Sequence, residues 1–95
     1  HREFLDKGEK YWNNWRETHL SIRPDLSGED LSGKAFKGYD FERCNFSNTS
    51  LQGSHFEECN LSDAILSGSE ASRAAFVKCN GPGVSFKDAE LDEAS

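Results

Sequence analysis

The sequence predicts a solenoid, a fold in which one short unit repeats and stacks along a single axis. Three regularities in the 95-residue chain predict it. From residue 26 onward a large apolar residue recurs at every fifth position. A small residue precedes it by two positions from residue 44 onward, and glycine often follows it by two positions. A period of five fits neither an α-helix nor a β-strand, so the chain must turn after every unit.

The large position is the predicted core of the solenoid. Twelve of its fourteen members are Leu or Phe, and no other Leu or Phe occurs after residue 23. These predicted core residues are Leu26, Leu31, Phe36, Phe41, Phe46, Leu51, Phe56, Leu61, Leu66, Phe76, Phe86 and Leu91. The predicted small inward residues are Cys44, Thr49, Ser54, Cys59, Ala64, Ser69, Ala74, Cys79, Val84 and Ala89. The first four units depart from this rule with Pro24, Glu29, Lys34 and Tyr39.

The units resemble those of the pentapeptide-repeat family, whose pattern is Ala-(Asp or Asn)-Leu-x-x. Cys44-Asn45-Phe46-Ser47-Asn48 and Cys59-Asn60-Leu61-Ser62-Asp63 are good copies of it. The resemblance covers residues 24–95. It implies a right-handed, four-sided parallel β-helix with four units per coil, and therefore about three and a half coils. Opposite charges pair between coils almost equally well for four-sided and three-sided coils, so the four-sided form rests on the resemblance.

The two ends of the chain differ. Residues 1–23 lie outside the repeat, and Tyr11, Trp12, Trp15 and His19 have the spacing of one helix face. We expect an N-terminal helical cap that Pro24 ends, with Trp12 and Trp15 covering the first coil. The alternative is an aromatic stripe that binds a partner. The last unit is still in phase at residue 95, so we expect a truncated C-terminus whose last coil is open to oligomerisation.

No arrangement of residues predicts catalysis, a cofactor or a metal site. The three histidines accompany no nucleophile motif, and the acidic residues do not form a calcium loop. Three cysteines with these spacings match neither a zinc signature nor a redox pair. Free thiols favour a reducing compartment, which we expect to be the cytoplasm. No apolar run is long enough to insert into a membrane.

The charge distribution disfavours some classes of binding partner. The chain has a net charge of −6, which divides into +1 for residues 1–23 and −7 for residues 24–95. An acidic surface disfavours direct nucleic-acid binding. We expect a non-enzymatic protein-interaction or scaffold module of a larger bacterial protein, with an unidentified protein partner. The candidate interaction face comprises Glu57, Glu58 and Asp63.

Two alternatives come from the family resemblance. Quinolone-resistance members resemble B-DNA in shape and charge and bind DNA gyrase, and an acidic rod is compatible with such a DNA mimic. The short repeat and basic residues such as Arg43, Arg73 and Lys87 oppose that interpretation. The other alternative is a secreted bacterial effector that is translocated into host cells.

Overall fold

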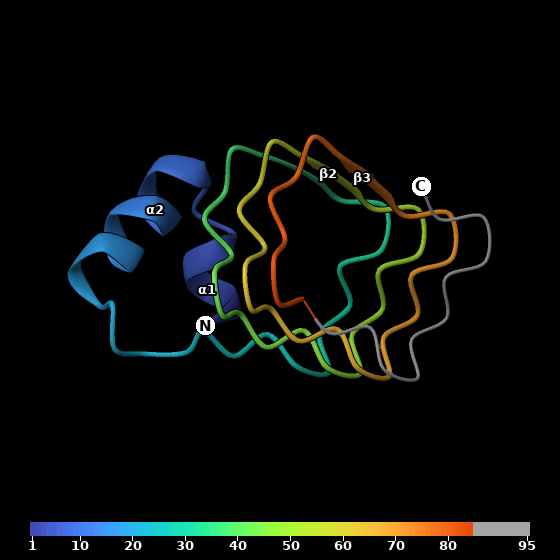
Figure 1. Ribbon diagram of the computed structural model, residues 1–95, viewed down its shortest axis with the longest axis horizontal. Helices are drawn as coiled ribbons and strands as arrows, with labels where there is room; N and C mark the ends of the chain where they lie inside the picture. The colour runs from blue at the N-terminus through green and yellow to red at the C-terminus, as the bar shows by residue number, and fades with distance from the viewer. Residues whose placement is uncertain (85–95) are drawn as a thin grey trace.

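The computed structural model of the protein describes residues 1–84. Two helices, α1 (Arg2–Leu5) and α2 (Glu9–Thr18), lie at one end of a stack of coils (Figure 1). Three short strands, β1 (Ala35–Lys37), β2 (His55–Glu57) and β3 (Ala75–Val77), form one parallel sheet along the stack. The N-terminal helices and the parallel repeat therefore confirm the predicted β-solenoid with helices before it.

Each coil advances by twenty residues. Phe36 aligns with Phe56, and Phe56 with Phe76, in the sheet. Three further columns of parallel bridges have the same separation: Asp25–Asn45–Ile65, Asp30–Ser50–Glu70 and Asp40–Asn60–Asn80. Surface charge could not distinguish a coil of three units from one of four. In the described residues the backbone register is twenty residues, which is the length of four units.

Each unit within residues 24–84 turns at its fifth position. In the first unit the Glu29 N–H donates to the Leu26 carbonyl at 3.3 Å, and Gly28 between them has a φ of +72°. A positive φ at the third residue of a four-residue turn is the feature of type II turns. All twelve fifth positions among residues 24–84 share this positive φ: Gly28, Gly33, Gly38, Arg43, Asn48, Gly53, Glu58, Asp63, Gly68, Arg73, Lys78 and Gly83.

The large and small positions form the interior of the coils. Nine of the predicted large residues, from Leu26 through Leu66, are buried, as are the small residues from Cys44 through Ala74. Phe76, Cys79 and Val84 are half-buried and pack against this core. Large residues stack between coils, with ring centroids 5.0 Å apart for Phe36–Phe56 and 5.1 Å for Phe56–Phe76. Phe86, Leu91 and Ala89 lie outside the described residues.

The N-terminal segment differs from the single helix that the sequence predicts. Gly8, with a φ of +103°, separates α1 from α2. The helix α2 ends at Thr18 rather than at Pro24, so the expected stop at Pro24 is wrong. His19 leaves the helical conformation, with φ −134° and ψ 51°, and residues 19–23 connect to the first coil without regular structure. Within residues 1–84, neither helix is long and apolar enough to cross a bilayer.

Candidate interaction surfaces

The end of the solenoid next to the helices has a hydrogen-bonding requirement that later coils do not have. In the interior of the stack, the residue at the second position of a unit bonds to the coil before it through both its backbone N–H and its carbonyl. The Asn60 N–H donates to the Tyr39 carbonyl at 3.0 Å, and the Asn60 carbonyl accepts from the Phe41 N–H at 2.8 Å. The first coil has no coil before it, so its corresponding groups need other partners.

Side chains of α2 supply partners along one side of the first coil. The Trp12 indole N–H donates to the Asp40 carbonyl at 2.7 Å. The Asp40 N–H donates to Asn13 Oδ1 at 2.8 Å. Arg16 Nη2 donates to the Glu42 carbonyl at 2.6 Å. The helix thus presents side-chain groups where a preceding coil would present its backbone.

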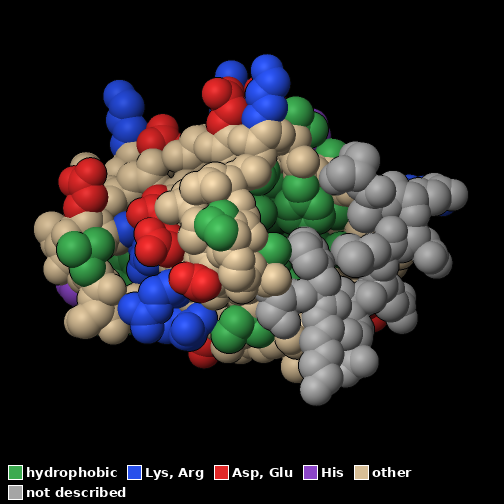
Figure 2. All heavy atoms as spheres, viewed as in Figure 1, with side chains coloured by type: hydrophobic (Ala, Val, Ile, Leu, Met, Phe, Trp, Pro, Cys, Tyr) green, Lys and Arg blue, Asp and Glu red, His purple; other side chains and the backbone are tan. Residues whose placement is uncertain are grey.

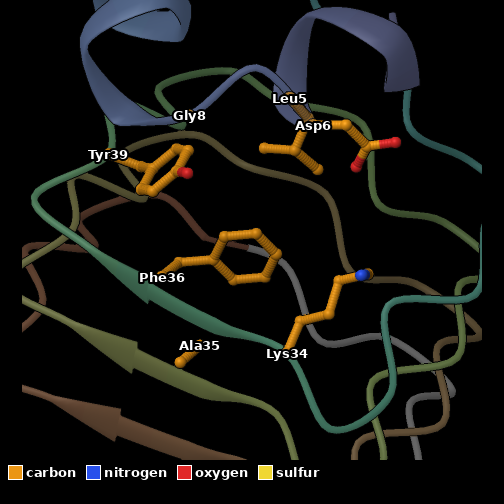
Figure 3. Close-up of a pocket in the computed structure, with 7 residues that line it drawn as sticks. All are labelled: Leu5, Asp6, Gly8, Lys34, Ala35, Phe36 and Tyr39. Carbon is orange, nitrogen blue, oxygen red and sulfur yellow. The ribbon is translucent and has the colours of Figure 1, made fainter.

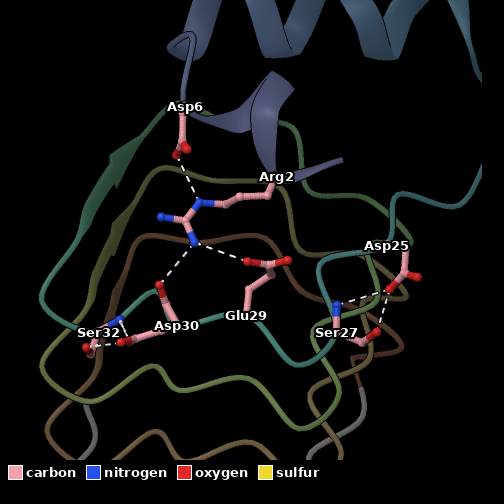
Figure 4. A network of polar contacts seen from close by, with 7 residues as sticks. All are labelled: Arg2, Asp6, Asp25, Ser27, Glu29, Asp30 and Ser32. Carbon is pink, nitrogen blue, oxygen red and sulfur yellow. Dashed lines mark hydrogen bonds and ion pairs between the residues drawn. The ribbon is translucent and has the colours of Figure 1, made fainter.

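His1 and Arg2 supply hydrogen-bond partners to backbone groups on another side of the first coil. His1 Nδ1 accepts the Asp25 N–H at 2.8 Å. Arg2 Nη1 donates to the Asp30 carbonyl and to Glu29 Oε1, both at 3.2 Å, while its Nε donates to Asp6 Oδ1 at 3.0 Å (Figure 4). Together with α2, these residues replace hydrogen bonds of an absent coil.

The predicted cap residues Trp12 and Trp15 lie in different layers. Trp12 is fully buried and its rings contact Phe41, with centroids 5.7 Å apart. Trp15 is half-buried and packs against Trp12, Phe4 and His19 at 5.5, 5.1 and 5.3 Å. Tyr11 is 43 % exposed. The four aromatic residues of the predicted helix face are therefore divided between the coil side and the outer side of α2.

Sequence reasoning identified Trp12 but missed His1, Arg2, Asn13 and Arg16. Polar residues near a chain start carry no periodic signal of their own. The signal was in the repeat instead, because the first four small positions hold Pro24, Glu29, Lys34 and Tyr39. Glu29 bonds to Arg2, and the Tyr39 ring stacks on Phe41 at 5.2 Å beside the cap. The departures mark the coil that faces the helices.

The predicted acidic face is partly neutralised. Glu57 Oε2 lies 4.0 Å from Lys37 Nζ on the neighbouring strand, and Glu57 Oε1 lies 3.6 Å from His55 Nε2. Glu58 and Asp63 are exposed at successive turns, each with a positive φ. The surface in Figure 2 likewise shows acidic and basic side chains next to one another rather than a continuous acidic field.

The cysteine thiols of the repeat, which are its candidate nucleophiles, lie in or beside the core. Cys44 and Cys59 are buried and Cys79 is half-buried, and all three are free thiols. Burial raises the pKa of the Cys44 thiol well above its usual range and raises the pKa of Cys59 to about 11. Thiols with such pKa values stay protonated at neutral pH and are poor nucleophiles. Within the described residues, His, Cys, Asp and Glu form no group suited to a metal ion.

Second-position carboxylates close the turns. Asp25 Oδ1 accepts both the N–H of Ser27, at 3.0 Å, and its hydroxyl, at 2.6 Å, and Asp30 binds Ser32 in the same way (Figure 4). These hydrogen bonds lower the pKa of both carboxyls, and the bond from the serine hydroxyl has the largest effect. Asn60 accepts the corresponding pair from Ser62. The Asp-or-Asn preference of the repeat therefore has a local cause, since either side chain offers the acceptor oxygen.

Comparison with known proteins agrees with this geometry. The family model for pentapeptide repeats matches residues 40–76 and 59–95, with eight copies. One similar solved structure is QnrB1, a plasmid-mediated fluoroquinolone resistance protein. It has 20 % identity and a TM-score of 0.50, and the match covers 76 % of this chain and 53 % of QnrB1. This chain thus spans about half the length of QnrB1.

A second similar structure is a pentapeptide repeat protein of the Arabidopsis thaliana thylakoid lumen. It has 18 % identity and a TM-score of 0.44, with 79 % of this chain and 63 % of that protein covered. No curated protein sequence matches this chain.

Proposed function

This chain belongs to the pentapeptide-repeat family, and from that premise we propose that it is a non-enzymatic module that binds another protein. The observation that carries the proposal is that polar side chains of the repeat make structural hydrogen bonds. In the described coils, Asp25 closes a turn and Trp12 caps the first coil, while corresponding positions of successive coils pair in parallel columns. Solenoids bind partners through such extended surfaces.

The proposed architecture is a right-handed, four-sided parallel β-helix from residue 24 onward, with residues 1–23 as its N-terminal cap. Four columns of parallel pairing within each twenty-residue coil support four sides. The bonds from Trp12, Asn13 and Arg16 to the first coil support the cap.

Several features support a non-enzymatic role in a reducing compartment such as the bacterial cytoplasm. Cys44 and Cys59 are buried with raised pKa values. His1 accepts the Asp25 N–H, and His55 lies beside Glu57, so both histidines have structural partners. Free thiols rather than disulfides are the usual state of cysteine in a reducing compartment.

Affinity capture from a bacterial lysate tests the proposal. The bait is the unmodified chain, compared with a triple variant of the candidate face, Glu57→Lys, Glu58→Lys and Asp63→Lys. A matched control, Glu3→Lys, Glu17→Lys and Glu70→Lys, changes the net charge equally at exposed positions elsewhere. Purified gyrase subunits are added as a separate probe.

We expect one stoichiometric protein that the unmodified chain and the control triple retain in high salt, and that the face triple loses. Equal loss from both triples indicates non-specific charge attraction and contradicts the face. An empty eluate contradicts a module that binds a partner by itself.

A second candidate function is an acidic DNA mimic that binds gyrase. The net charge of the repeat supports it, because an acidic rod can compete for a basic DNA-binding surface. The ion pair between Lys37 and Glu57 opposes it, because it interrupts a row of negative charge. Retention of gyrase by the unmodified chain, lost in the face triple and in high salt, would favour the mimic over the scaffold.

A further inference from the structure

We propose that the open edge of β1 accepts a short extended segment of a partner polypeptide as an additional parallel strand. This inference rests on the proposed protein-binding function and names a surface for it. The strand β1 is the first in the sheet order β1-β2-β3, so only one of its two edges is paired. Edge strands of this kind can extend a sheet onto another chain.

The backbone of β1 has hydrogen-bonding groups that face away from β2. In a parallel ladder, alternate residues bond to opposite neighbours. The Lys34 carbonyl accepts from the His55 N–H at 2.9 Å, and the Gly38 N–H donates to the Glu57 carbonyl at 3.0 Å. The backbones of the intervening odd residues, Ala35 and Lys37, therefore point to the open edge. Within residues 1–84, no hydrogen bond reaches them from another element.

Within residues 1–84, the N-terminal segment makes no hydrogen bond to this edge. Its side chains bond to backbone groups at positions 25, 30, 38, 40 and 42, which flank β1 on both sides. At β1 itself there is a pocket of about 300 Å³ instead (Figure 3). It lies between the α1–α2 connection and the strand, with Leu5, Asp6 and Gly8 opposite Lys34, Ala35 and Phe36. The pocket therefore occupies the place where the strand of a preceding coil would lie.

The surroundings define the segment that fits. The twenty-residue register places the central residue of an added strand over Phe36, at the pocket that Leu5 and Tyr39 also line. A small β-branched residue such as valine suits a strand at that position. Its neighbours lie over Ala35 and Lys37, both exposed, while the Lys34 side chain lines the pocket itself (Figure 3). Lys37 already has an acidic cross-strand neighbour in Glu57 at 4.0 Å, and Asp6 is held by Arg2. The complementary partner is an extended Glu-Val-Glu type of segment.

The test uses the full chain and the peptide acetyl-Thr-Glu-Val-Glu-Thr-amide as the probe. Backbone amide shifts and hydrogen exchange are measured by NMR while the peptide is titrated. We expect saturable shifts centred on Ala35 and Lys37, with roughly tenfold slower exchange of these two amides at saturation. A peptide with Lys in place of both Glu residues should bind more weakly, because it meets Lys34 and Lys37.

Two variants separate edge pairing from general stickiness. Ala35→Pro removes the outward N–H at an edge position where proline is tolerated, and it should abolish the shifts. Ala35→Ser keeps the N–H and should bind as the unmodified chain does. Should Ala35→Pro fail to fold by circular dichroism, Lys34→Glu is the substitute, and it should weaken binding of the acidic peptide.

Three outcomes overturn the inference. They are the absence of shifts at Ala35 and Lys37, equal binding by folded Ala35→Pro, and concentration-dependent protection of both amides without peptide, which would indicate pairing between two copies of this chain. A failure here stays distinct from a failure of the proposed function. A captured partner that Ala35→Pro retains in full would contradict the β1 edge and leave the protein-binding module standing.

Discussion

The fifth residue of each unit carries a conformational requirement that the amino acid there does not always meet. All twelve described fifth positions have a positive φ, and only six of them are glycine. The left-handed region costs an ordinary L-residue roughly 1–2 kcal/mol, whereas glycine adopts it freely. Asn48 and Asp63 tolerate it better than Glu58 does, because short polar side chains bond locally to the backbone.

Substitutions at two turns measure this requirement. Glu58→Gly should stabilise the protein by about 0.5 kcal/mol, because relief at a φ of +55° exceeds the added entropy of the unfolded chain. Gly33→Ala should destabilise it by about 1 kcal/mol, since φ there is +70° although a Cβ would meet no atom within 4 Å. Urea unfolding of both variants checks the signs. A stabilising Gly33→Ala would show that backbone conformation is not the cause.

The stacked phenylalanines are the second feature at the residue scale. Phe56 is fully buried between Phe36 and Phe76, so Phe56→Ala should cost roughly 3–5 kcal/mol in urea unfolding. Phe76→Ala is the matched control and should cost less, because Phe76 is only half-buried. A loss below about 1 kcal/mol for Phe56→Ala would contradict its inward position in the core.

At the scale of the element, hydrogen bonds within each turn and between neighbouring coils hold the repeat in its conformation. Asp25 and Asp30 accept two hydrogen bonds each within their own turns, and these bonds lower the pKa of both carboxyls. A carboxyl whose pKa is lower in the folded state stabilises that state above its unfolded pKa of about 3.9. The contribution is lost as the pH falls through the folded pKa.

We therefore expect the melting temperature to change little from pH 7 to pH 5 and to fall below about pH 4. Replacing both carboxyls, Asp25→Asn with Asp30→Asn, keeps an acceptor oxygen and removes the titration. The fall should be smaller in this variant, as measured by thermal circular dichroism. Both side chains are exposed, so the difference is modest. Identical pH profiles for the two proteins would contradict the role of these turns.

For the helices, the sequence pattern predicted that a helix exists but not where it begins and ends. An aromatic spacing of three and four predicted a helix, and α2 contains Tyr11, Trp12 and Trp15. The same spacing could not place Gly8 as a break or end the helix at Thr18. Helix ends are accordingly the weakest part of such predictions.

At the scale of the molecule, the cap and the coils form one hydrogen-bonded stack. Trp12→Ala should cost roughly 3–5 kcal/mol, because it removes a buried ring that contacts Phe41. Trp12→Phe keeps a ring and removes the donor to the Asp40 carbonyl, so it should cost about 1–3 kcal/mol. Thermal and urea unfolding measure both variants. The matched Trp15→Ala should be milder, because Trp15 is half-buried on the outer side.

Removal of the whole segment is the stronger version of this experiment. Without residues 1–22 the first coil exposes apolar side chains and unpaired backbone groups, so we expect aggregation or loss of a cooperative transition. A monodisperse monomer with an unchanged melting curve would mean that the helices serve another purpose than capping.

The five-residue period by itself determined the repeating turn, the inward position of the large residues and the small residues beside them. These features are local, since each unit repeats one conformation and the pattern records it at every turn. The tertiary structure decided the coil length of twenty residues, because surface charges pair almost as well at other separations while backbone hydrogen bonds allow one register. It also decided that His1, Arg2, Asn13 and Arg16 complete the first coil and leave β1 open. Such partnerships join groups that are distant in sequence, so no period records them and only the folded arrangement brings them together.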